Sequence, residues 1–154
     1  MKTRVIGLGN ALRRDDGVGI HVARALAAGP QHESTDVDVV EAGTCGFALV
    51  ELMHDWDRVV LVDAADFPGV EPGTLIWLDP EAYSASGPLW SVHGFDLATA
   101  LRFGARIGCR MPREVHVLAV QVADASTFDE ALTPTLAATV PRAVEAILDI
   151  LTKA

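Results

Sequence analysis

Residues 3–26, TRVIGLGNALRRDDGVGIHVARAL, decide the fold. Thr3–Gly7 is a short apolar run typical of a buried strand, and a glycine-rich, charged loop from Leu8 to Asp16 follows it. The next residues carry an apolar stripe at the i, i+4, i+7 and i+8 spacing of a helix: Val18, Val22, Ala25 and Leu26. We therefore expect an amphipathic helix that ends near Gly29, and a strand–loop–helix unit opens the chain.

Four more segments have the length and composition of strands: Val37–Glu41, Arg58–Asp63, Gly73–Leu78 and Glu114–Val122. Arg58–Asp63 is almost continuously apolar, which is typical of a parallel strand buried on both faces. Only about nine residues separate Asp63 from Gly73, and a parallel crossover needs a dozen or more. Gly73–Leu78 is therefore expected to run antiparallel to its neighbour.

Helical segments are expected at Gly46–Met53, from about Val92 to Arg106, and over the end of the chain. Thr133 is placed to cap this last helix, Pro134 suits its first turn, and Pro141 is expected to kink or divide it; Asp79–Trp90 is expected to be an irregular loop. The pattern predicts an α/β fold: a three-layer sandwich with a mostly parallel five-stranded sheet (one antiparallel strand) flanked by helices, in a single domain of residues 1–154.

The composition excludes several classes of function. The net charge of −9 argues against nucleic-acid binding, which needs a cationic surface. No apolar run approaches the roughly 20 residues that cross a bilayer, and the N-terminus lacks the pattern of a signal peptide. We therefore expect a cytoplasmic protein with no membrane insertion. The two cysteines, Cys45 and Cys109, have no paired spacing, so neither a disulfide framework nor a structural zinc site is indicated.

Three residues in separate loops could carry chemistry: Asp16, Asp63 and His93. In an open α/β sheet, ligands bind outside the carboxyl ends of the strands, near a switch point in strand order. If the first and third strands are neighbours, Asp16 and Asp63 open into one crevice, and His93 adds an imidazole. Such a mixed oxygen and nitrogen set suits nickel, zinc, manganese or iron. A metal there could polarise a carbonyl and activate a water.

Each of these residues also has a structural interpretation. Asp15 or Asp16 could cap the helix that follows, Asp63 could bond to loop amides, and His93 could be an ordinary residue of a first helical turn. Cys45 lies in a loop, but the sequence shows no base or pKa-lowering group for a catalytic thiol.

The glycine loop does not indicate a nucleotide site. Gly7 and Gly9 follow a strand, but the third glycine of the dinucleotide fingerprint and the lysine of a P-loop are both absent. The adjacent Asp15 and Asp16 would also repel a phosphate.

The opening motif, Gly7-Leu8-Gly9-Asn10 followed by Asp15-Asp16-Gly17 and Gly19, is similar to the signature of the [NiFe]-hydrogenase maturation endopeptidases. Four further segments resemble family motifs in the same order: Ala42–Gly46, Val60–Ala64, Ser91–His93 and Leu132–Pro134. The resemblance covers nearly the whole chain. It implies a metal-dependent endopeptidase that removes the C-terminal peptide from the nickel-loaded precursor of a hydrogenase large subunit.

The resemblance also implies the site. Asp16, Asp63 and His93 match the family's metal ligands and catalytic residues, although many members have Glu in place of Asp16. Nickel is expected to arrive within the precursor, while zinc or cadmium could occupy the site in vitro. Three alternatives remain open: a nickel-sensing assembly chaperone without protease activity, a metal-dependent hydrolase of small phosphorylated or amide substrates, and a binding domain in which the aspartates only cap structure.

Overall fold

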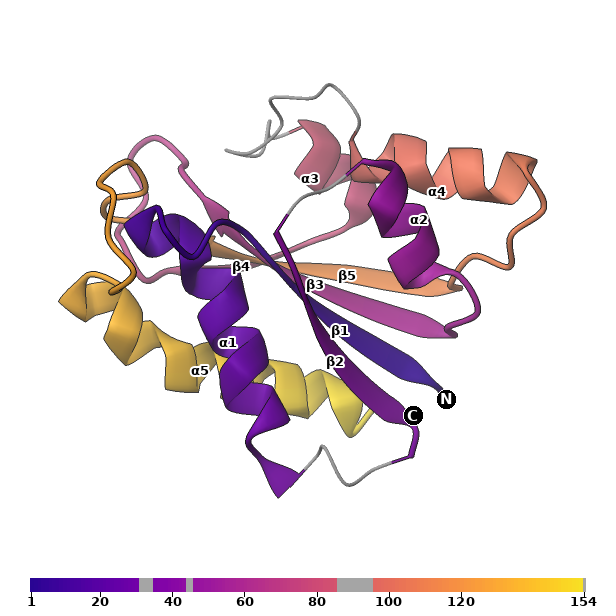
Figure 1. The fold of residues 1–154 in the computed structure, drawn as a ribbon, viewed down its shortest axis with the longest axis horizontal. Helices are drawn as coiled ribbons and strands as arrows, with labels where there is room; N and C mark the ends of the chain where they lie inside the picture. Colours follow the sequence, from indigo (N-terminus) through magenta and orange to yellow (C-terminus); the bar gives the residue numbers. More distant parts are fainter. Residues whose placement is uncertain (31–34, 44–45, 86–95, 154) are drawn as a thin grey trace.

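The computed structural model describes residues 1–30, 35–43, 46–85 and 96–153. Its sheet has five strands in the order β2-β1-β3-β5-β4 (Figure 1). The strands are β1 (Thr3–Leu8), β2 (Val37–Ala42), β3 (Arg58–Ala65), β4 (Leu75–Leu78) and β5 (Glu114–Gln121). β1 pairs in parallel with β2 and β3, β5 pairs in parallel with β3, and β4 pairs antiparallel with β5. The mostly parallel five-stranded sheet with one antiparallel strand is confirmed.

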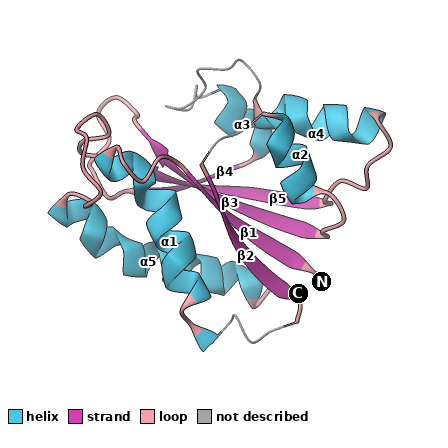
Figure 2. Cartoon of the chain, viewed as in Figure 1, coloured by secondary structure: helices cyan, strands magenta, loops and turns pink. Residues whose placement is uncertain are grey.

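Helices cover both faces of the sheet (Figure 2). They are α1 (Val18–Ala27), α2 (Phe47–Met53), α3 (Pro80–Ala85), α4 (Leu97–Arg106), α5 (Pro134–Leu151) and a short 3-10 helix, η1 (Arg14–Gly17). α1 and α5 lie on one face and α2, α3 and α4 on the other. Each face has its own apolar cluster, the first around Val62 and Ile147 and the second around Leu61 and Leu49. The strands are buried on both sides, as a near-continuous apolar run requires.

Two glycines allow α1 to lie directly on the sheet. A Cβ atom on Gly19 would lie 2.3 Å from the backbone oxygens of both Leu8 and Val62. A Cβ atom on Gly7 would lie 2.2 Å from the oxygen of Gly19. Only glycine fits such close backbone approaches. The packing fixes the start of α1, and with it the loop that connects β1 to α1.

Two expectations, about α3 and α4, need correction. Asp79–Trp90 is not wholly irregular, because α3 occupies Pro80–Ala85. α4 begins at Leu97 rather than near Val92, and its cap is Asp96, whose carboxylate accepts a hydrogen bond from the Thr99 amide at 2.7 Å. A short polar side chain before a helix satisfies the free amides of its first turn, and this sets the start.

α5 also differs from expectation. It runs through Pro141 as one undivided helix, which is anchored on the core by Leu136, Ala143 and Ile147. Thr133 occupies the cap position but makes no side-chain cap hydrogen bond. Within the described ranges, no helix is long and apolar enough to cross a membrane.

The strand order creates a switch point between β1 and β3. From β1 the chain moves to β2 on one side, and then to β3 on the other side of β1. The connections at the carboxyl ends of β1 and β3 therefore diverge and leave a crevice where ligands bind in such sheets. The expected neighbouring of the first and third strands is confirmed, so the Asp16 loop and Asp63 open to the same edge of the sheet.

Candidate active site

Asp63 lies near the carboxyl end of β3, and none of its surface is exposed. Its Oδ2 atom accepts a 2.6 Å hydrogen bond from the Tyr83 hydroxyl, and its Oδ1 atom accepts one from the Ala64 amide at 2.9 Å. Burial raises the pKa of Asp63 well above its ordinary value, and the charge of Asp16 raises it further; the hydrogen bonds from Tyr83 and Ala64 act in the opposite direction. The structural interpretation expected hydrogen bonds from loop amides, but the amide that bonds to Asp63 belongs to Ala64, which lies within β3 itself.

Asp16 lies in η1, and only 5% of its surface is exposed. Its Oδ2 atom accepts a hydrogen bond from the Asn10 amide at 3.0 Å, so the carboxylate reaches back across its own loop. Burial raises the pKa of Asp16, while the Asn10 bond and the charge of Arg13 oppose that rise. The residue before α1 is Gly17, and no side chain caps this helix. The interpretation of Asp16 as a helix cap is therefore wrong.

Asp16 and Asp63 act on each other electrostatically, because the charge of Asp16 contributes to the raised pKa of Asp63. Two buried carboxyl groups of like charge are unfavourable together unless a cation or a shared proton relieves them. Their hard oxygen donors suit a divalent metal ion, so the described part of the site fits a cation. The arrangement could bind a metal ion, whose positive charge would relieve the repulsion.

Asp15 points away from this pair. Its carboxylate is fully buried and accepts hydrogen bonds from the segment between β5 and α5, including the Thr133 amide at 2.8 Å. It caps neither η1 nor α1. The helix-cap interpretation is thus wrong for Asp15 as well. The Thr133 hydroxyl bonds to the Asp15 carboxylate rather than to a backbone amide in the first turn of α5.

His93 and Cys45 lie outside the described residues, so their predicted places stay predictions. Among residues 1–30, 35–43, 46–85 and 96–153, no group of three His, Cys, Asp or Glu side chains is placed to hold a metal ion. The predicted set of Asp16, Asp63 and His93 depends on a third member from beyond those ranges.

Tyr83 is a site residue that sequence reasoning missed. It lies on α3 with 2% of its surface exposed, and its hydroxyl bonds to Asp63. The only signal in the sequence was that Tyr83 is the sole tyrosine of the chain. A buried tyrosine hydroxyl needs a polar partner, but the sequence does not say which one.

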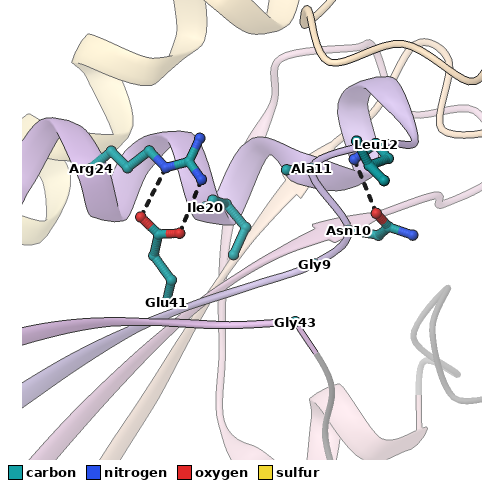
Figure 3. Close-up of a pocket in the computed structure, with 8 residues that line it drawn as sticks. All are labelled: Gly9, Asn10, Ala11, Leu12, Ile20, Arg24, Glu41 and Gly43. Carbon is teal, nitrogen blue, oxygen red and sulfur yellow. Dashed lines mark hydrogen bonds and ion pairs between the residues drawn. The ribbon is translucent and has the colours of Figure 1, made fainter.

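An open pocket of about 520 Å³ borders the opening loop on the side of β2. Gly9, Asn10 and Leu12 line one wall, and Arg24 and Glu41 line another (Figure 3). Glu41 accepts two hydrogen bonds from Arg24, at 2.8 and 3.1 Å, which hold the far wall in place. Because the Asn10 amide also bonds to Asp16, the pocket and the carboxylate pair share one loop.

Fold and site together define a class: α/β sandwich proteins with an acidic crevice at the switch point of the sheet. A sequence profile of the hydrogenase maturation protease family matches residues 20–150. The chain belongs to this family, and as a protease of that family it is a hydrolase.

Individual relatives agree with the family assignment. The chain is 28% identical to the hydrogenase expression/formation protein HupD of Rhizobium leguminosarum bv. viciae, over 96% of this chain and 72% of that protein. It is 29% identical to the hydrogenase 2 maturation protease of Escherichia coli, over 96% and 89% respectively. The structure of the hydrogenase maturating endopeptidase HybD from E. coli superposes with a TM-score of 0.79 at 26% identity, covering 98% of this chain and 92% of that one.

Proposed function

We propose that this protein removes the C-terminal peptide from the nickel-loaded precursor of a [NiFe]-hydrogenase large subunit. Family membership supports proteolysis in hydrogenase maturation. The observation that carries the rest is the buried carboxyl pair, in which the charge of Asp16 helps to raise the pKa of Asp63. Such a pair is poised for a cation, and nickel seated in the precursor is a cation that arrives with the substrate.

In this proposal the metal belongs to the substrate, and Asp16, Asp63 and His93 complete its coordination. Oxygen and imidazole ligands suit nickel. A metal ion with open positions can polarise a carbonyl or activate a water, which is the chemistry that peptide hydrolysis needs. The three residues would thereby bind the nickel site of the precursor and align the adjacent peptide bond for attack.

The protein's own contacts favour this use of the carboxylates. Tyr83 fixes the orientation of Asp63 through its 2.6 Å hydrogen bond. The Asn10 amide fixes Asp16, and the charge of Arg13 favours the ionised form of Asp16 that a metal requires. The pocket beside Gly9 and Leu12 gives a segment of the precursor room along the loop that carries Asp16.

The test is mass spectrometry of the cognate precursor, nickel-loaded and nickel-free, after incubation with wild-type protein, Asp16→Asn or His93→Ala. The proposal expects one C-terminal peptide, released only from the nickel-loaded precursor, with both variants slowed by roughly 100-fold or more because alignment is lost. Asp55→Asn is the matched control, since Asp55 is an exposed aspartate that follows α2, near the amino end of β3, and it should cleave like wild type.

Other results would point elsewhere. Precursor that binds with its tail intact would replace the protease with a nickel-sensing chaperone. Equal cleavage of the nickel-free precursor would remove nickel from the proposal. Undiminished cleavage by His93→Ala would remove His93 from the site.

A further inference from the structure

We infer that Asp15 is a positioning residue: its buried carboxylate fastens the loop that carries Asp16 to the segment between β5 and α5. Within the described residues, the Asp15 carboxylate accepts hydrogen bonds from Ala123, Asp124 and Thr133. It accepts none from Asn10, which bonds to Asp16, or from Tyr83, which bonds to Asp63. Its relevance to cleavage rests on the proposed function, whereas its effect on the loop does not.

The contacts of Asp15 are numerous and come from three residues. Oδ2 accepts hydrogen bonds from the amides of Ala123 at 3.0 Å and Asp124 at 2.9 Å. Oδ1 accepts one from the Thr133 amide at 2.8 Å. The Thr133 hydroxyl lies 2.9 Å from Oδ1 and 2.8 Å from Oδ2. Both oxygens are therefore held by donors from a segment more than 100 residues away in sequence.

Stability alone does not explain this choice of residue. Asp15 has no exposed surface, and in the described part of the chain no Lys or Arg forms an ion pair with it. A buried carboxylate is costly to remove from water, and a well-packed apolar side chain can be at least as stabilising. The carboxylate instead fixes the orientation of the loop, because each of its two oxygens accepts hydrogen bonds from a different set of donors.

Hydrogen bonds on both sides of the loop make the position of Asp16 depend on that of Asp15. The Asp15 amide also bonds to the Asp124 oxygen at 3.0 Å, and the Arg14 amide bonds to the Asp129 oxygen at 2.8 Å. On the other side, Asp16 closes the loop through its bond to the Asn10 amide. We therefore expect the loop to move as one unit. Asp15 holds it to the segment between β5 and α5, and Asp16 lies on its opposite side.

Asp15→Asn is the sharpest variant. An asparagine has one acceptor oxygen and one donor amide, so its amide must face either the Thr133 amide or the amides of Ala123 and Asp124. The asparagine NH2 group would then face a backbone N–H group in a buried position, and neither donor would have an acceptor. Asp129→Asn is the matched control, because Asp129 lies in the facing loop. In the part of the chain that the structure describes, its exposed carboxylate accepts a single hydrogen bond, from the Ala131 amide at 2.8 Å.

Thr133 offers a second route that keeps Asp15 intact. Thr133→Val removes the hydroxyl donor at nearly the same volume, and Thr133→Ser restores it. If Asp15→Asn does not fold, this pair tests the same fastening.

The first measurement is amide hydrogen exchange on the free protein, because the Asn10 amide reports directly on the carboxylate of Asp16. In Asp15→Asn, exchange at Asn10 should accelerate by about 10-fold or more, since a hydrogen bond to a charged group is lost. Amides in the middle of β1 and β3, such as Val5 and Leu61, should exchange as in wild type. Thr133→Val should show the same pattern more weakly, and Thr133→Ser and Asp129→Asn should not.

The second measurement is cleavage of the nickel-loaded precursor. Asp15→Asn should lower kcat on the order of 100-fold with KM little changed, because a small misplacement of a reacting group costs that much. Unchanged exchange at Asn10, or acceleration spread equally over Val5 and Leu61, would overturn the inference. If wild-type protein does not cleave the precursor, the proposed function fails, and the exchange pattern alone decides the role of Asp15.

Discussion

Asp16 and Asp63 are both buried, and burial raises the pKa of each above the ordinary value of 3.8. A carboxyl group whose pKa is raised by folding binds its proton more tightly in the folded protein than in the unfolded chain. The contribution of these two groups to stability is therefore most favourable at and below pH 3.8, and it is lost as the pH rises through their folded-state pKa values. At neutral pH the carboxyl pair costs the free protein stability, which a bound cation would restore.

Asp16→Asn should consequently raise the free energy of unfolding at pH 7 although it slows cleavage. Asparagine keeps an acceptor oxygen for the Asn10 amide but removes one of the two like charges. Urea unfolding of the metal-free proteins at pH 7 and pH 4 checks this. The variant should have the higher midpoint at pH 7 and lose that advantage at pH 4. A variant less stable than wild type at pH 7 would contradict the expected cost of the pair.

Tyr83→Phe should act in the opposite direction. The Tyr83 hydroxyl lowers the pKa of Asp63, so its removal raises that pKa further and makes the ionised form less favourable. We expect a loss of about 2 kcal/mol at pH 7, the usual contribution of a hydrogen bond to a charged group. Urea unfolding should show a smaller loss at low pH, where Asp63 is protonated. An equal loss at both pH values would mean that the contribution of the Tyr83 hydroxyl does not depend on the ionisation of Asp63.

At the scale of elements, the position of α1 depends on a glycine. Gly19→Ala would place a methyl group 2.3 Å from backbone oxygens of β1 and β3, which cannot move aside as a side chain can. We expect a loss of about 3 kcal/mol, the upper end for overpacking, measured by chemical denaturation. Gly104→Ala in α4 is the matched control, because the new methyl group meets side-chain atoms of Met111 and Val50 rather than backbone, and alanine favours helix. Equal losses in the two variants would contradict the close approach of α1.

The elements that could be predicted are those with an internal pattern. Apolar runs revealed the five strands, and the short connection after Asp63 revealed the antiparallel β4. α3 was missed because its six residues are too few to show a helical stripe. Because α3 was not predicted, Tyr83 was not identified as the hydrogen-bond donor to Asp63. The partner of Asp15 was equally invisible, since no local pattern links it to Thr133.

For the molecule as a whole, Arg58 joins the start of β3 to the end of the chain. Its guanidinium bonds to Glu114 at 2.8 Å and to the carbonyl oxygens of Ile150 and Lys153 at 3.0 and 2.9 Å. Only 4% of the Arg58 surface is exposed. One residue therefore holds β3, β5 and the end of α5 together.

Arg58→Met should cost about 3 kcal/mol, because two carbonyl groups and one carboxylate lose a charged donor. The loss should depend on pH. Arg58 lowers the pKa of Glu114 below its ordinary value of 4.5, so the pair stabilises the fold above pH 4.5 and this contribution disappears as the pH falls through the lowered value. Denaturation from pH 7 to pH 2 checks this. Glu114→Gln should remove the pH-dependent part and keep the bonds to α5; an unchanged pH profile would contradict the pairing.

The contact between Asp15 and Thr133 also sets an order of events during translation. The two residues are 118 positions apart. The loop with Asp16 leaves the ribosome well before Thr133, which fastens it. A nascent chain therefore has its acidic loop exposed but not yet aligned until Thr133 has emerged and folded back onto Asp15.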